Sequence, residues 1–394
     1  MKVGIAALLL AYVLSQFYRA FLAVLSPALA ADLGATPEDL AFASGLWFLT
    51  FAAMQVPVGA ALDRVGPRRT AAVLLALGGG GGAVLFALAQ SPLQITLAMA
   101  LIGVGCSPVL MASYYIFARI YPAALFGTLA GATVGFGSLG NIAGSVPLAW
   151  AVEALGWRAT MAGLAGLSVL VAGLVLALVR DPAPSPRGAA QGGSVLDVLA
   201  IRALWPVFAL MFVAYAPAAA IRGLWAGPYL GQVFGADATG IGRGTLIMAL
   251  AMIAGSLAYG PLERLFRTRK WIIFGGNLLT ALACLTLALW PQQGFWTGTL
   301  LLAAIGLFGA TFALVVAHAR AFVPPHLIGR GITLINLFSI LGVAAAQFAT
   351  GPLFAAVQAA NPDPAAAFSA IFLGFGLSIL AGLVLYLGAR DRID

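Results

Sequence analysis

The chain has 394 residues, of which 62% are hydrophobic and only 8% are charged. Soluble domains carry about 25% charged residues, so this composition excludes a water-soluble globular protein. The net charge of +8 comes from short loops between apolar runs and not from one basic patch, which argues against a nucleic-acid partner. The sequence also has no catalytic triad, metal-ligand cluster or phosphate-binding loop, and we therefore expect no enzyme activity, no cofactor and no metal site.

The apolar residues fall into twelve runs, each long enough to cross the hydrocarbon core of a bilayer, which takes about 20 helical residues. In chain order the runs lie near residues 4–30, 40–62, 70–90, 94–117, 127–151, 159–179, 203–229, 241–262, 271–290, 297–318, 330–356 and 366–388. The alternating pattern of a β-barrel is absent. The sequence therefore predicts an all-α integral membrane protein with twelve transmembrane helices.

The loops differ in charge on the two sides of this predicted membrane. Most of the 20 Lys and Arg residues lie on one side, whereas the loops opposite carry mainly acidic residues. This positive-inside bias predicts a multi-pass protein of the cell (cytoplasmic or inner) membrane with both termini in the cytoplasm. The first apolar run is too long for a cleavable signal and lacks a small-residue cleavage site.

A Pro-, Gly- and Ser-rich stretch at residues 181–194 separates the sixth run from the seventh and is typical of a flexible tether. The halves on either side match in their polar loops: Asp63-Arg64 recurs as Glu263-Arg264, displaced by 200 positions. Such matches indicate an internal duplication. We predict an N-terminal six-helix bundle over residues 1–180, a cytoplasmic linker over 181–200 and a C-terminal six-helix bundle over 201–394.

The loop from Gly59 to Arg69 resembles the signature loop of the major facilitator superfamily, and a degenerate copy stands at Gly260–Arg264. The resemblance implies a secondary transporter in which two pseudo-symmetric bundles alternate access to a central site. An acid at a helix end can pair with nearby arginines in one conformation and release them in another. The predicted latch consists of Gly59, Asp63, Arg64, Gly66, Arg68, Arg69, Glu263 and Arg264. The alternative is that the arginines serve only as topology signals.

Two arginines, Arg19 and Arg222, lie inside the first and seventh runs. A guanidinium at membrane depth costs at least about 2.5–3.5 kcal/mol on insertion scales and usually marks a functional site. A tyrosine precedes each arginine by seven residues, Tyr12 and Tyr215, so that each pair would share a face of a continuous helix. The resemblance implies that the first and seventh helices face each other across the cavity.

All 12 acidic residues lie in loops or near the ends of runs, so the sequence offers no intramembrane counter-charge for the two arginines. The simplest counter-charge is a substrate anion, because guanidinium groups bind carboxylate and other oxyanions in bidentate fashion. The predicted substrate site consists of Arg19, Arg222, Tyr12, Tyr18, Tyr215, Trp225, Tyr114 and Tyr115. The alternative is that one or both arginines extend to the interface.

The sequence thus predicts a transporter, acting as a monomer, for a small organic or inorganic anion, most simply a carboxylate. Its partners would be this solute, membrane lipid, and protons or a counter-anion. Two other substrates stay open. A proton-coupled exporter of hydrophobic compounds is disfavoured because the fifth run carries only an incomplete version of the exporters' glycine motif. A copper importer is suggested only by the spacing of Met248 and Met252.

Overall fold

The computed structural model describes residues 2–121, 123–182, 195–324 and 327–392. Throughout these ranges the regular structure is helical and contains no strand, which confirms the predicted all-α membrane fold. The first half consists of α1 (Lys2–Phe17), α2 (Leu22–Leu33), α3 (Pro37–Ala53), α4 (Gln55–Arg64), α5 (Pro67–Leu74), η1 (Leu75–Gly80), α6 (Gly81–Ala87), α7 (Pro92–Ile120), α8 (Ala123–Ala143), α9 (Val146–Leu155) and α10 (Trp157–Leu178).

The second half begins after the linker and is also entirely helical where it is described. It consists of α11 (Val195–Leu199), η2 (Arg202–Leu204), α12 (Trp205–Ala214), α13 (Ala216–Ala220), η3 (Ile221–Trp225), α14 (Ala226–Phe234), α15 (Ala238–Phe266), α16 (Lys270–Leu289), α17 (Phe295–Phe308), α18 (Phe312–Arg320), α19 (Ile328–Ala360) and α20 (Pro364–Tyr386).

Each of the twelve predicted runs is helical. Among the described residues, 10 helices are long and apolar enough to cross a membrane without a sharp bend. The first run becomes an eleventh span if α1 and α2, which meet at an angle of 51°, are counted together. The fifth run is occupied by α8 and α9.

The chain folds as two compact units. One contains residues 1–188 and 237–243, and the other contains residues 189–236 and 244–394. The first turn of α15 therefore packs with the first unit, although its remaining turns belong to the second.

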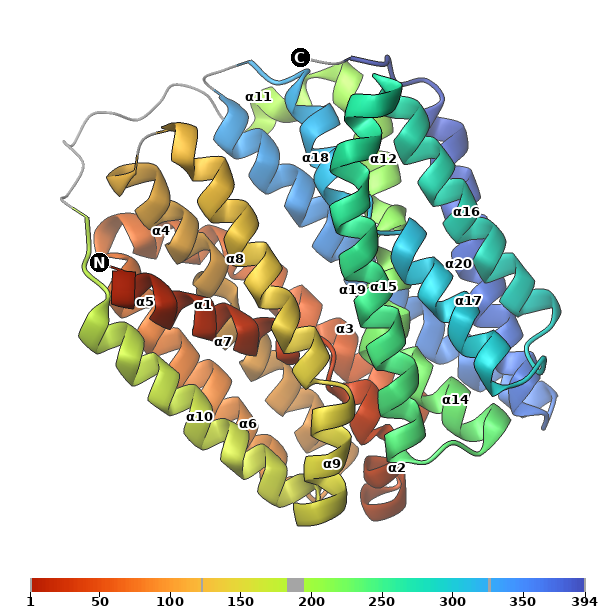
Figure 1. The fold of residues 1–394 in the computed structure, drawn as a ribbon. Coiled ribbons are helices and arrows are strands. Elements are labelled where there is room, and N and C mark those ends of the chain that lie inside the picture. The colour runs from red at the N-terminus through yellow and green to blue at the C-terminus, as the bar shows by residue number, and fades with distance from the viewer. Residues whose placement is uncertain (1, 122, 183–194, 325–326, 393–394) are drawn as a thin grey trace. The chain divides into compact units, whose positions relative to one another are not determined.

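Within the first unit, α1 packs against α7, α8 and α10, and α7 also packs against α3 and α6 (Figure 1). Glycines bring the π-helical η1 close to α7. A Cβ atom added to Gly105 would lie 2.0 Å from the backbone nitrogen of Gly79, so only a glycine fits there. Small residues at helix crossings allow this approach in membrane proteins, where packing rather than hydrophobic transfer holds helices together.

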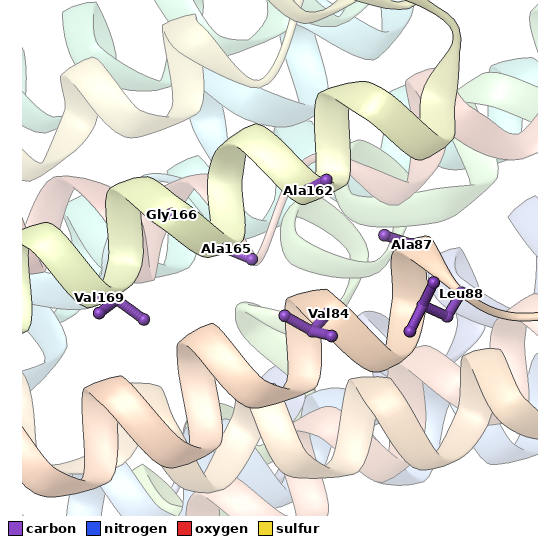
Figure 2. Close-up of a pocket in the computed structure, with 7 residues that line it drawn as sticks. All are labelled: Val84, Ala87, Leu88, Ala162, Ala165, Gly166 and Val169. Atoms are coloured by element: carbon purple, nitrogen blue, oxygen red, sulfur yellow. The ribbon is translucent and has the colours of Figure 1, made fainter.

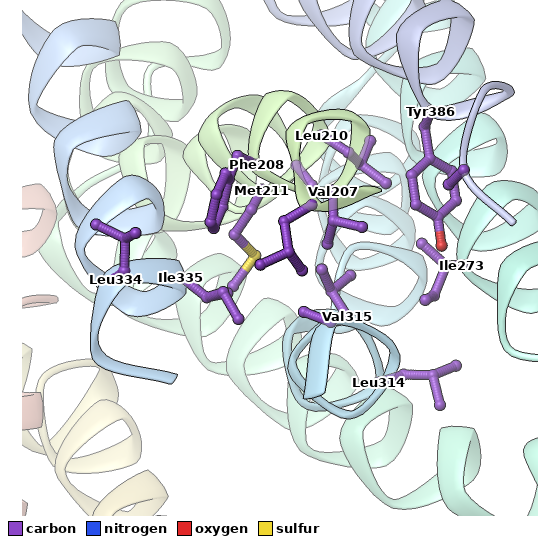
Figure 3. Close-up of a cluster of buried hydrophobic side chains, with 14 of the residues drawn as sticks. Val207, Phe208, Leu210, Met211, Ile273, Leu314, Val315, Leu334, Ile335 and Tyr386 are labelled. Atoms are coloured by element: carbon purple, nitrogen blue, oxygen red, sulfur yellow. The ribbon is translucent and has the colours of Figure 1, made fainter. Parts of the chain in front are cut away.

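The second unit repeats this arrangement. Its first long helix, α12, packs against α19 and α20, as α1 packs against α8 and α10. Figure 3 shows the core that results, in which Phe208 and Met211 of α12 lie close to Ile335 of α19 and Val315 of α18. Phe208 stacks on Phe338 of α19 with ring centroids 4.7 Å apart. The shared pattern of neighbours is what a duplicated six-helix bundle requires.

Candidate functional site

Arg19 lies where the first membrane span is interrupted. α1 ends at Phe17 and α2 begins at Leu22. In between, the amide of Arg19 donates to the carbonyl of Gln16, three residues back, which tightens the chain relative to an α-helix. The guanidinium carbon lies 5.4 Å from the ring centre of Trp47 and 4.8 Å from that of Phe51. Two aromatic faces of α3 therefore hold this cation.

The polar atoms around Arg19 are not all satisfied. Its Nε is buried and has no hydrogen-bond partner in the described part of the chain, and the same holds for Nε1 of Trp47 and Oε1 of Gln16. The described residues also place no carboxylate within ion-pair distance of Arg19, since their two ion pairs are Arg158–Asp32 and Arg269–Glu263. The site thus has a cation and an N–H donor for which the described residues provide no acceptor.

Arg222 lies at a corresponding irregularity of the seventh span. It is the second residue of the π-helix η3 and is 2% exposed. Arg222 follows Arg19 by 203 positions, so both arginines within the spans lie at a departure from α-helical geometry. Such departures are frequent at functional sites.

These irregularities correct one premise of the sequence analysis. Tyr12 and Arg19 were expected to share a helix face, as were Tyr215 and Arg222, because seven residues make two turns of a continuous helix. The 51° bend between α1 and α2 and the π-helical turn η3 change that register. The expectation that the two arginines face each other stays a prediction.

Tyr12, Tyr114 and Tyr115 take different positions in the first unit. Tyr12 is buried, accepts a hydrogen bond of 2.9 Å from Nε2 of Gln16, and packs against Gly137 of α8. Tyr114 lies near Tyr12. Tyr115 instead lies near the predicted cytoplasmic end, where its hydroxyl accepts a hydrogen bond of 3.0 Å from Arg119. Tyr114 therefore lies near Tyr12 of the interrupted span, whereas the hydroxyl of Tyr115 is engaged with Arg119.

Tyr18 and Trp225 tie helices together in this conformation. The Tyr18 hydroxyl lies 2.9 Å from Oγ of Ser168 on α10. The indole N–H of Trp225 donates to Oε1 of Gln347 at 3.1 Å and to Oγ1 of Thr350 at 3.0 Å, both on α19. Tyr215 is half-buried and packs on Phe312. The polar atoms of Tyr18 and Trp225 are thus engaged with the protein rather than presented to a ligand.

The predicted latch loop is held by an acid other than Asp63. Asp63 lies beside the Tyr115 hydroxyl. Asp181, at the start of the linker, accepts a hydrogen bond of 2.8 Å from the backbone amide of Arg68, and Nε of Arg68 donates to the carbonyl of Leu176. Among the described residues, Arg64 and Arg69 form no ion pair with an acid. Asp181 thus caps the first turn of α5, where backbone amides attract an anion.

The two glycines of this loop differ. Gly66 has φ of +95°, and a Cβ atom there would lie 2.8 Å from Cγ of Asp181, so a side chain would be strained and would displace the cap. Gly59 has no neighbouring atom within 4 Å of an added Cβ, so no other helix approaches it closely in this conformation.

The second unit has an equivalent cap. Asp391, just after α20, accepts hydrogen bonds from the amides of Lys270 and Arg269 at 3.1 and 3.2 Å and from Thr268. Arg269 in turn forms an ion pair of 2.6 Å with Glu263 and donates to the carbonyl of Ala317. Glu263 therefore pairs inside its own unit with an arginine that is not part of the predicted latch, and the latch role of Glu263 stays a prediction. The side chain of Arg264 lies outside the described residues.

Comparison with known proteins identifies the family of this chain. The sequence profile of the Major Facilitator Superfamily matches residues 8–226, more than half of the chain and a stretch that includes both Arg19 and Arg222. The chain belongs to the Major Facilitator Superfamily. It is therefore a membrane transporter, as the signature loop and the duplicated bundle indicated.

Solved structures of this superfamily share the fold. A D-xylose–proton symporter is 16% identical with a TM-score of 0.80, covering 99% of this chain and 98% of its own. The nucleoside transporter NupG is 14% identical with a TM-score of 0.75, covering 98% and 99%. A bacterial homologue of the lysosomal transporter Spinster is 17% identical with a TM-score of 0.71, covering 98% and 95%. No match was found among curated protein sequences.

The sequence analysis missed the caps made by Asp181 and Asp391, although a signal exists. Each aspartate directly follows an arginine just beyond the last helix of its half, as Arg180-Asp181 and Arg390-Asp391. The repeated dipeptide places one acid of this transporter at equivalent ends of both units.

Replacing Asp391 by asparagine is expected to lower the thermal stability of the transporter. Burial raises the pKa of Asp391, but the hydrogen bonds from Thr268 and from the amides of Lys270 and Arg269 outweigh this effect and lower the pKa below its usual range. A carboxylate with a lowered pKa stabilises the fold above its unfolded pKa, and this stabilisation is lost as pH falls through the folded value. Loss of a helix cap costs about 1 kcal/mol, or about 2–4 °C in Tm.

The measurement is Tm of wild type and Asp391→Asn in detergent at pH 7 and at decreasing pH toward 3. The difference between the two proteins should be present at pH 7 and shrink below about pH 4. A difference that stays constant with pH would show that the charge of Asp391 does not stabilise the cap.

Proposed function

We propose that this Major Facilitator Superfamily transporter carries a small anion, most simply a carboxylate, across the cytoplasmic membrane, and that Arg19 and Arg222 bind it. The observation that carries the proposal is the environment of Arg19. The partly exposed guanidinium of Arg19 rests on two aromatic rings, while its buried Nε and the indole N–H of Trp47 have no acceptor in the described part of the chain.

The energetics favour an anionic ligand at this position. A cation at membrane depth is costly, and two aromatic faces return only about 1–2 kcal/mol of that cost. A carboxylate can accept hydrogen bonds from both the guanidinium and the indole, so it would satisfy the orphaned donors and neutralise the charge. Gln16 leaves one acceptor oxygen in the same region, which suits a substrate that also carries a hydroxyl or amino donor.

Tyr12, Tyr114 and Tyr215 complete the proposed binding residues. Tyr18 and Trp225 are left as packing residues because their polar atoms bond α10 and α19. The spacing of Met248 and Met252 no longer favours a copper importer, because these two residues pack against Gly306 of α17. Both termini would be cytoplasmic, which places the caps of Asp181 and Asp391 on the inner side.

The proposal is tested by the thermal stability of the purified protein against a panel of ligands. The panel contains mono- and dicarboxylates, hydroxy acids, inorganic oxyanions, neutral sugars and lipophilic cations. At least one anion should raise Tm of wild type, and the same anion should give no shift with Arg222→Gln. If sugars or lipophilic cations stabilise the protein and anions do not, the anion assignment is wrong.

A further inference from the structure

An open, apolar groove lies between α6 and α10 on the surface of the first unit. It has a volume of about 390 Å³ and is lined by Val84 and Leu88 on one side and by Ala165, Gly166 and Val169 on the other. Figure 2 shows Val84 on α6 and Val169 on α10 at facing sides of this gap. Small residues of α10 leave the space, because Gly166 has no side chain to fill it.

The residues that line this α6–α10 groove are apolar and exposed, which suits contact with a hydrocarbon chain. Val84, Val169 and Leu88 are 46%, 52% and 69% exposed. Both helices belong to membrane-spanning segments, so what fills an open apolar groove on their surface is an acyl chain and not water. The groove is therefore a contact site for a lipid tail.

A pair of opposite charges stands at one end of the groove. Nη2 of Arg158 donates to the carbonyl of Ala89, the residue after Leu88, at 3.0 Å, and Arg158 precedes Ala162 of the groove by one helical turn. Nη1 of Arg158 lies 3.0 Å from Oδ2 of Asp32, and the two side chains are 45% and 49% exposed.

This charge pair is positioned by its surroundings. The Trp157 ring lies 4.1 Å from the Arg158 guanidinium carbon, and the indole N–H donates to the same Oδ2 of Asp32 at 2.8 Å. Trp157 is 4% exposed and holds the pair from the protein side, at the beginning of the membrane-spanning helix α10, where lipid headgroups lie. A fixed cation and a fixed anion, each about half exposed, thus meet the headgroup region beside an acyl-chain groove.

We propose that the α6–α10 groove binds one chain of a phospholipid whose headgroup carries both a phosphate and a primary ammonium. The phosphate accepts hydrogen bonds from Arg158, and the ammonium donates to Asp32. An anionic headgroup without an amine would leave Arg158 as the single cation shared between the phosphate and Asp32. A quaternary ammonium has no N–H to donate. The pair therefore selects phosphatidylethanolamine over phosphatidylglycerol and phosphatidylcholine.

The test is native mass spectrometry of the purified full chain in detergent, with each of these three lipids added in turn. Gly166→Leu places a side chain in the groove, and Gly163→Leu is its matched control, because Gly163 lies on the same helix, outside the groove, with no atom within 4 Å of an added Cβ. Wild type and Gly163→Leu should retain one phosphatidylethanolamine, and Gly166→Leu should retain at least tenfold less. Equal retention of phosphatidylethanolamine by the two variants would contradict the binding of a lipid chain in the groove.

The headgroup assignment has a separate readout. Asp32→Asn should keep lipid binding but lose the preference for phosphatidylethanolamine over phosphatidylglycerol, because the partner of the ammonium is gone. Equal retention of the two lipids by wild type would show that the Arg158–Asp32 pair does not read the headgroup. Neither outcome depends on the substrate of the transporter.

Discussion

Replacing Arg19 by glutamine is expected to raise the thermal stability of the ligand-free transporter and to abolish its stabilisation by anions. Removing a cation at membrane depth that has no ion-pair partner among the described residues relieves about 2.5–3.5 kcal/mol on insertion scales. The lost contacts with Trp47 and Phe51 offset about 1–2 kcal/mol of this gain. A net gain of about 1 kcal/mol corresponds to an increase of about 2–4 °C in Tm.

Anion affinity should move in the opposite direction. Loss of one partner of a desolvated, hydrogen-bonded charge pair costs at least about 2 kcal/mol, which is about a 30-fold increase in Kd. Arg19→Lys keeps the positive charge but not the planar guanidinium that forms bidentate hydrogen bonds, so this variant should retain part of the anion affinity.

Both quantities come from thermal-shift titrations of the purified variants, with uptake of the same anion into proteoliposomes as the functional readout. Arg243→Gln removes an exposed arginine and should change neither Tm nor the anion response. An arginine that only supports the fold gives the reverse result, because Arg19→Gln would then lower Tm and leave the anion response intact.

Replacing Gly66 by alanine is expected to destabilise the first unit, whereas the same change at Gly59 should have little effect. A residue with a Cβ at φ of +95° is strained by about 1–2 kcal/mol. The added atom would also lie 2.8 Å from Cγ of Asp181 and would push the carboxylate away from the amide of Arg68. The two effects together cost about 2–3 kcal/mol, or about 4–12 °C in Tm.

Gly59→Ala is a matched control in the same segment, Gly59 to Arg69. Its Cβ would point into open space within the helix α4, where alanine is favoured over glycine. Tm and transport rate of the two variants are measured side by side. If Gly59→Ala lowers transport at unchanged Tm, Gly59 is a contact in another conformation of the cycle, whereas equal loss of stability in both variants would contradict the role of the Asp181 cap.

Much of this transporter could be predicted from its sequence because the signals concerned are local. Length and hydropathy of a run decide whether a helix can span a bilayer, and charge in the adjoining loops decides its orientation. The fixed displacement between Asp63-Arg64 and Glu263-Arg264 predicted the duplicated bundle that the structure and the family match confirm. Arg19 and Arg222 stand out in the sequence because each lies deep within an apolar run.

The partners of these residues could not be read in the same way, because they come from segments far apart in the chain. Nothing in the sequence around Arg19 predicted the break between Phe17 and Leu22, which contains neither proline nor glycine. The engagement of Tyr18 with Ser168 joins residues 150 positions apart, and that of Arg68 with Asp181 joins residues 113 apart.

The sequence by itself determined the membrane class, the spans and the two arginines within them, since hydrophobic transfer and charge act residue by residue. Only the tertiary structure decided which acid caps which helix, which aromatic rings hold Arg19 and which tyrosine is already occupied. Each of these depends on how helices pack, and a hydrogen bond or ring contact exists only when packing brings two groups to the right distance and orientation.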